Sequence, residues 1–275
     1  MPLNILNVSH IMDLLNLFDR KPYKIGIALS GGGVKGLCHA GVLKALEEFG
    51  IKPDIISGVS AGALVGALYS DGYTPDEIAV CFEEINFRTM TKIRLPNGGF
   101  FTTEIFKKFL NRKLHARTFE ELKIPLRVVA TDLDNGLSVT FRSGHLIDPI
   151  VASCTFPVLF TPKIIDGVHY IDGGVLKNFP VSIIRKECEK VIGINASPLV
   201  ADEYKQSILN VALRSYNFMF KANIMHDKGL CDLLIEPVDM GNYETFDVDK
   251  GREIFELGYQ SARQMLALKL DTNFI

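Results

Sequence analysis

The sequence predicts an α/β fold, with a mostly parallel sheet that helices cover on both faces. Short apolar segments of strand length alternate through most of the chain with longer segments in which apolar residues recur at helical spacing. The 275 residues are 47% hydrophobic and 23% charged, ordinary globular values that exclude a disordered chain, a coiled coil and a collagen-like fibre. Since no linker rich in proline and serine divides the chain, we expect one domain over residues 21–275, preceded by an N-terminal helical extension at 1–20.

The individual elements follow from the apolar pattern and from the residues that bound it. Gly50 ends the first long helix as a C-cap, and Thr74 begins a later one, with Pro75 at its first position and Glu77 completing a capping box. Asp166-Gly167, between two short apolar segments, signals a two-residue hairpin turn. The predicted strands span residues 24–30, 54–59, 126–132, 137–142, 163–165, 168–171, 191–195 and 233–236. The predicted helices span residues 11–18, 35–49, 61–69, the segment after Thr74, 103–114, about 205–226 and about 249–269.

The segment 87–101 fits neither pattern. It mixes three basic residues with six large apolar residues and contains the turn sequence PNGG. Two interpretations stay open: a lid that also contacts a lipid bilayer, and an ordinary surface connection over the core.

Charge and cysteine usage restrict the partners and the compartment. With 30 basic and 32 acidic residues the net charge is −2, so no basic excess favours binding to nucleic acid. The five cysteines are scattered and odd in number, which disfavours a disulfide scaffold or a zinc ribbon and favours a reducing compartment. No secretory signal is recognisable, and the longest uncharged segment, 55–70, is shorter than the about 20 residues that span a bilayer. We therefore expect a cytoplasmic protein, with a peripheral membrane contact left open.

The first of three motifs is SGGGVKG at residues 30–36, which we call the glycine loop. It joins a predicted strand to a helix, where glycines and a helix N-terminus can hold an anion or a developing oxyanion. It also matches the dinucleotide pattern G-x-G-x-x-G, but Asp54, about 20 residues on, stands at the start of a strand rather than its end. The Walker A pattern fails because no lysine follows the last glycine. A tight turn without any ligand is the remaining alternative.

The second motif is the G-x-S-x-G pentapeptide around Ser60. Gly58 and Gly62 flank the serine, a strand precedes the motif, and a helix of small residues follows it. This strand–turn–helix context is the one in which such a serine projects its hydroxyl as a nucleophile. The alternative is a serine that only caps the helix.

The third motif is Asp172-Gly173-Gly174, at the end of an apolar strand. Asp172 is the better candidate for a base, because Asp166 belongs to the hairpin turn and is expected to be exposed and structural. A turn or capping role for Asp172 is the alternative. Only one histidine, His226, lies after Asp172 in the chain, and it falls within or just beyond a predicted helix.

A histidine base therefore has no clear candidate. We interpret His226 as a residue on a helix surface and His39, one turn into the helix after the glycine loop, as packed rather than catalytic. No cluster of histidine, cysteine and carboxylate residues has metal-ligand spacing, so neither a metal nor another cofactor is predicted.

Together, SGGGVKG, GVSAG and DGG resemble the motifs of the patatin-like phospholipase family, in the family's order. The segment ASCTFPVLFTP at 152–162 resembles the one that the family carries before its DG-[AG] motif. The resemblance extends from about 24 to 178 and is greatest to the small bacterial members. The predicted helix near 249–268 also resembles their C-terminus.

The resemblance implies a three-layer α/β/α fold and a serine acyl hydrolase with a catalytic dyad. Ser60 would be the nucleophile, Asp172 the general base, and Gly31, Gly32 and Gly33 the oxyanion hole. The substrates would be phospholipids, lysophospholipids or related acyl esters, cleaved through an acyl-enzyme. A non-catalytic or nucleotide-binding regulatory protein is the alternative, and no feature predicts the oligomeric state. The residues that would support the motifs are Lys35, Gly36, Gly58, Gly62, Gly173 and Gly174.

Overall fold

The computed structural model covers the predicted core. The described residues are 21–85, 103–157, 159–198, 223–245 and 247–270, with positions 207, 211, 214, 215 and 218. The predicted extension at 1–20 with its helix at 11–18, the segment 87–101, and most of the predicted helix at about 205–226 lie outside the described residues.

The centre of the fold is an eight-stranded, mostly parallel sheet, as predicted. The strand order is β5-β6-β3-β2-β1-β7-β8, with β4 paired to β3 off this path. The parallel strands are β1 (Tyr23–Leu29), β2 (Ile55–Val59), β3 (Leu126–Asp132), β7 (Cys188–Ile194) and β8 (Leu233–Ile235). β4 (Leu137–Phe141) and β6 (Val168–Asp172) run in the opposite direction, and β5 (Lys163–Ile165) pairs antiparallel with β6.

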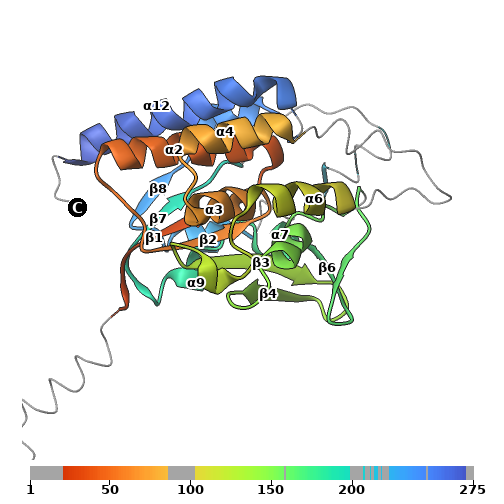
Figure 1. Cartoon of the computed structure of the whole chain (residues 1–275). Coiled ribbons are helices and arrows are strands. Elements are labelled where there is room, and N and C mark those ends of the chain that lie inside the picture. Colours follow the sequence, from red (N-terminus) through yellow and green to blue (C-terminus); the bar gives the residue numbers. More distant parts are fainter. Residues whose placement is uncertain are drawn as a thin grey trace, which may run out of the picture.

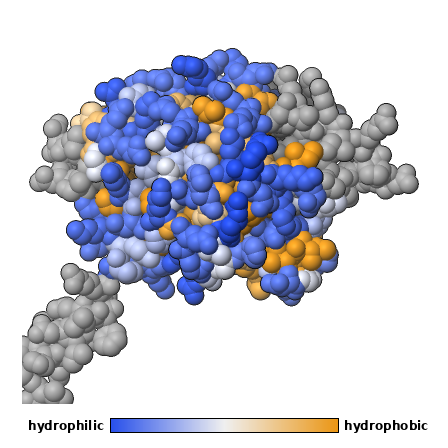
Figure 2. Space-filling model, viewed as in Figure 1, coloured by the Kyte–Doolittle hydropathy of each residue, from blue (hydrophilic) through white to orange (hydrophobic). Residues whose placement is uncertain are grey.

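Helices cover both faces of this sheet, which confirms the three-layer arrangement. On one side lie α2 (Gly36–Glu48), α3 (Ala61–Asp71), α4 (Pro75–Glu84) and α12 (Gly251–Leu270), and the opposite side carries α9 (Val181–Ile184) (Figure 1). In the same view the surface is largely hydrophilic, with its apolar side chains gathered in separate patches (Figure 2). Among the described residues, no helix combines the length and the apolar character that crossing a bilayer requires.

Successive residues of the central strands enter different cores. Ile27 and Leu29 of β1 pack into the larger core with α2 and α3, whereas Ala28 packs with Phe179 and Ile184 beneath α9. Side chains of a strand alternate between the two faces, so burial on both faces requires the continuous apolar segment that the sequence has here.

Local signals placed several element ends correctly. Thr74 and Glu77 form the predicted capping box of α4, and the hairpin turn has positive φ at both Asp166 (50°) and Gly167 (83°). Helix α2 begins at Gly36, one residue later than predicted, because Gly33–Lys35 form a 3-10 turn first. Other helices of the structure are α6 (Glu104–Lys113), as predicted, and α7 (Ile147–Ser153), α8 (Gly174–Lys177) and α11 (Met225–Lys228).

The edges of β3 bring the ends of two other strands together. β4 pairs with residues 128–132 of β3, β2 pairs with 126–129, and β6 pairs with 130–132. Because a strand has only two edges, this overlap places β2 and β6 end to end along the edge opposite β4. β2 is parallel to β3 and β6 is antiparallel, so both run toward one point. Val59 faces Val129 there, and Asp172 faces the next residue, Ala130.

Candidate active site

Ser60 lies where β2 ends and α3 begins. It has φ 53° and ψ −123°, a strained backbone conformation for a residue with a side chain. Gly58 and Gly62 allow the tight turn, because a Cβ at Gly58 would lie 2.5 Å from the Gly62 carbonyl oxygen. The Ser60 amide donates to Ser153 Oγ at 2.8 Å, and Ser153 Oγ donates to the Val129 carbonyl at 2.6 Å. These two hydrogen bonds fasten the strained turn to β3.

Asp172 accepts a hydrogen bond from the hydroxyl of Ser60. Ser60 Oγ donates to Asp172 Oδ2 at 2.6 Å, and the Gly174 amide donates to Asp172 Oδ1 at 2.8 Å. The Asp172 side chain is buried, with the residue only 1% exposed. Burial raises the pKa of this carboxyl to about 7, although the hydrogen bonds from Ser60 and Gly174 act in the opposite direction. A carboxylate of this basicity, in contact with a hydroxyl, can take its proton.

The glycine loop approaches Ser60 from β1. A Cβ at Gly31 would lie 3.3 Å from Ser60 Cβ, so the loop and the serine are immediate neighbours. The amide of Gly31, however, donates to the Asn178 carbonyl at 3.1 Å and is therefore engaged within the protein. Within the ranges that the structure describes, the amides of Gly32 and Gly33 have no acceptor.

The three glycines predicted for an oxyanion hole therefore differ in whether their amides are already hydrogen-bonded. Gly31 anchors the loop through its own amide, whereas Gly32 and Gly33 do not use theirs to anchor it. Gly33 has φ 62°, and a side chain there would collide with the main chain of Thr245. The neighbouring Val34 amide donates to the Thr245 carbonyl at 2.9 Å, so a C-terminal segment packs against the loop.

The remaining motif residues hold the elements close together. A Cβ at Gly36 would lie 2.8 Å from Ala61 Cβ, which brings the starts of α2 and α3 into contact. Gly173 packs against the Val129 carbonyl, and Gly174 supplies the amide that holds Asp172. Lys35 lies half-buried in the 3-10 turn that joins the loop to α2.

Four other polar residues that the sequence analysis considered take no part in the contact between Ser60 and Asp172. His226 is exposed on α11, and Asp166 is exposed at the hairpin turn. His39 is fully buried and donates from Nε2 to the Ser30 carbonyl at 2.7 Å, and burial lowers its pKa to about 4. Asp54 accepts the amides of Lys24 and Ile25 at 3.0 and 2.8 Å, so its carboxylate joins β1 to β2 rather than facing the glycine loop.

Sequence patterns missed Ser153, Asn178 and Thr245. The segment ASCTFPVLFTP, which contains Ser153, could have indicated this residue. Asn178 follows Asp172 by six positions, at the end of α8. Thr245 gave no local signal, because its contribution is a main-chain carbonyl that any residue could supply.

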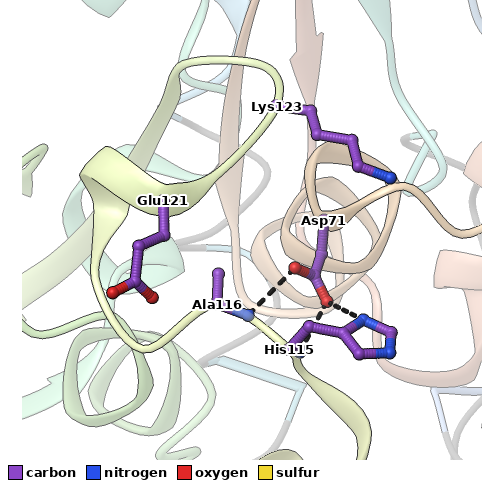
Figure 3. A pocket seen from close by; sticks show the side chains of 5 residues that line it. All are labelled: Asp71, His115, Ala116, Glu121 and Lys123. Atoms are coloured by element: carbon purple, nitrogen blue, oxygen red, sulfur yellow. Dashed lines mark hydrogen bonds and ion pairs between the residues drawn. The ribbon is translucent and has the colours of Figure 1, made fainter.

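A surface pocket lies at the end of α3 that is farther from Ser60. Because α3 has 11 residues, this end is about 16 Å from Ser60 along the helix axis. Asp71, His115, Ala116, Glu121 and Lys123 line it (Figure 3). The Asp71 carboxylate accepts the amides of His115 and Ala116 and contacts His115 Nδ1 at 2.9 Å. These contacts fasten the chain before β3 to the end of α3, and we assign the pocket a structural role. In the described part of the chain, no group of three histidine, cysteine or carboxylate residues is arranged to hold a metal ion.

Comparisons with known proteins agree with this arrangement. The model of the family described as patatin-like phospholipase matches residues 27–184, which include all three motifs. Human patatin-like phospholipase domain-containing protein 6 is 27% identical over 86% of this chain, which spans 20% of the human protein. The uncharacterized protein YqhO of Bacillus subtilis is 34% identical over 66% of this chain and 74% of its own length. VipD from Legionella pneumophila shares the fold, with a TM-score of 0.60 at 16% identity over 91% of this chain and 68% of that chain. This chain belongs to the patatin-like phospholipase family.

Proposed function

We propose that the protein is a serine acyl hydrolase that uses Ser60 and Asp172 as a catalytic dyad. Its substrates would be carboxylic esters of phospholipids, lysophospholipids or related acyl lipids. The observation that supports this most directly is the 2.6 Å hydrogen bond from the strained Ser60 to a buried carboxylate. Membership of the patatin-like phospholipase family supports the lipid class.

In the first half of the reaction, Ser60 Oγ attacks the carbonyl carbon of the ester. Asp172 takes the hydroxyl proton as the new C–O bond forms, and the carbonyl electrons move onto oxygen to give a tetrahedral oxyanion. When the intermediate collapses, the bond to the alcohol breaks and the alcohol takes the proton from Asp172. The acyl group then remains on Ser60.

In the second half, water repeats these steps in reverse order. Asp172 takes a proton from water as the water oxygen attacks the acyl carbon. Ser60 Oγ regains a proton from Asp172 as the fatty acid leaves. A lysolipid or another alcohol in place of water would make the same site a transacylase.

The oxyanion would be stabilised by the amides of Gly32 and Gly33. Both lack an acceptor in the described structure, and the loop that carries them is the neighbour of Ser60. Losing one such donor typically costs about 10²–10³ in kcat. Gly31 is left out of this role because its amide already has the Asn178 carbonyl as acceptor.

We further propose that residues 21–275 form one catalytic domain that works in the cytoplasm and contacts membranes peripherally. A substrate that resides in a bilayer or a micelle requires the enzyme to reach that surface. Flotation with liposomes tests the contact, and a protein that stays with the unbound fraction would exclude it.

Labelling with a fluorophosphonate, followed by mass spectrometry of the intact protein, tests the nucleophile. We expect a single adduct on the wild type and none on Ser60→Ala, together with loss of hydrolysis of p-nitrophenyl butyrate and lysophosphatidylcholine. Hydrolysis that persists in Ser60→Ala would refute the proposal. A folded wild type that takes no adduct and hydrolyses neither substrate would favour a fold kept for binding.

A further inference from the structure

Asn178 carries a buried polar group that its surroundings leave unpartnered. The residue is 2% exposed, and its side-chain oxygen Oδ1 forms no hydrogen bond with any described residue. A buried polar atom without a partner destabilises the folded state, because it has lost its hydrogen bonds to water. Most buried polar side-chain atoms in proteins do have a partner, so this exception calls for an explanation.

The carboxamide of Asn178 points at the space between the glycine loop and the candidate nucleophile. The position that a Cβ at Gly31 would occupy is in direct contact with Asn178 Oδ1 and lies 3.3 Å from Ser60 Cβ. The unpartnered oxygen of Asn178 and the Ser60 side chain thus both lie beside Gly31, where any side chain at position 31 would meet them.

The main chain of Asn178, by contrast, is fully engaged. Its amide donates to Asn223 Oδ1 at 2.8 Å, and its carbonyl accepts the Gly31 amide at 3.1 Å. Asn223 Nδ2 donates in turn to the Gly174 carbonyl at 3.0 Å, beside Asp172. The position of residue 178 is therefore fixed by main-chain hydrogen bonds that do not need its own side chain.

A carboxamide in this position can act as a donor. Its NH₂ group carries two N–H bonds, and rotation about the last side-chain torsion exchanges the positions of oxygen and nitrogen. No hydrogen bond of Oδ1 has to break for this rotation. An N–H group aimed at the space beside Ser60 would meet the negative oxygen that forms when the serine attacks an ester.

We propose that the Asn178 carboxamide is a catalytic hydrogen-bond donor to the tetrahedral oxyanion, beside the amides of Gly32 and Gly33. The role rests on the proposed acyl hydrolase function. In the rotated carboxamide Nδ2 takes the place of the unpartnered Oδ1, and this donor has its full partner only when the oxyanion forms during the reaction.

Substitution of Asn178 by alanine tests the role. The main-chain contacts remain, so the variant should fold, and its kcat for p-nitrophenyl butyrate should fall about 10²-fold with little change in KM. Asn178→Asp keeps the shape and removes both N–H donors, so it should lose at least as much. Asn111→Ala, which removes an exposed carboxamide from α6, is the control and should keep kcat within about threefold of wild type.

A second measurement distinguishes hydrogen-bond donation by the Asn178 carboxamide from a role of this side chain in packing. A trifluoromethyl ketone forms a hemiketal oxyanion on a serine, so its inhibition constant should rise by the same factor by which kcat falls. A packing role would instead raise KM and lower the urea midpoint without this correlation. Asn178 variants with kcat within threefold of an active wild type would overturn the inference and leave the proposed function intact. A wild type without hydrolysis and without a fluorophosphonate adduct would remove both.

Discussion

Replacing Asp172 by asparagine should stabilise the protein at neutral and alkaline pH while abolishing its activity. Asparagine has the same shape, can accept the Gly174 amide and can donate to Ser60 Oγ, so both hydrogen bonds of the carboxylate have a replacement. What disappears is a buried group that burial disfavours in its charged form.

The sign of the pH dependence follows from the direction of the pKa shift. Asp172 has a pKa of about 7 in the folded protein, against about 3.9 for an unperturbed aspartate in the unfolded chain. Between these values the folded state binds more protons than the unfolded state. The free energy of unfolding therefore falls as pH rises through this window. Below pH 4 the buried carboxyl causes no loss of stability, and above pH 7 the loss is complete.

The magnitude comes from integrating this difference. Between pH 5 and pH 8, wild type should lose about 2–3 kcal/mol relative to Asp172→Asn, at 1.36 kcal/mol for each pKa unit. Over the same range the kcat/KM of wild type should rise toward a plateau above pH 7, because a protonated Asp172 cannot accept the proton of Ser60.

Urea unfolding of both proteins at each pH unit from 5 to 8 measures the difference directly. Ser60→Ala is the control, since it is also inactive but keeps the buried carboxyl. Its stability should fall over this range at least as steeply as that of wild type, because it lacks the Ser60 hydrogen bond that lowers the pKa of Asp172. A difference between wild type and Asp172→Asn that stays constant within about 0.5 kcal/mol over this range would refute the reasoning.

Two further substitutions test whether His226 and the glycine loop take part in catalysis. His226→Ala should leave kcat within a few fold of wild type, because this histidine is exposed on α11; a loss of about 10³ would favour a conventional triad instead. Gly33→Ala should lower kcat at least about tenfold, because the new Cβ would displace the loop from the main chain of Thr245. Gly50→Ala is the matched control: it has a similar φ of 74° but open space around it, so it should cost about 1 kcal/mol of stability and leave kcat unchanged. Equal effects of both glycine variants on kcat would exclude a specific role for the loop.

The predictions that held depend on residues close together in the chain. Thr74 and Glu77 form their capping box within one helical turn, and Asp166-Gly167 closes its hairpin without help from other elements. The fold class was also predictable, because the apolar segments needed for a sheet buried on both faces are visible in the sequence alone.

The features that the sequence could not indicate depend on partners far along the chain. Gly31 has the same local sequence context as Gly32 and Gly33, yet its amide is occupied by the carbonyl of Asn178. Ser153 likewise reads as one small polar residue among others until β3 brings the Val129 carbonyl within 2.6 Å of it. A motif identifies which residues take part, but only the tertiary contacts assign each of them its hydrogen bond.

The register of β3 explains why two unfavourable features persist at one place. Ser60 has a strained backbone and Asp172 is a buried carboxyl, and each alone would destabilise the folded chain. Their strands end at adjacent residues of β3, Val129 and Ala130, so the sheet brings together two residues that are 112 positions apart. Moving either group away would require a shift of strand register, which turns every core side chain of that strand to the wrong face. The cores on both faces of the sheet therefore hold the dyad in contact, and the strain and the buried carboxyl persist because relieving them would cost far more packing.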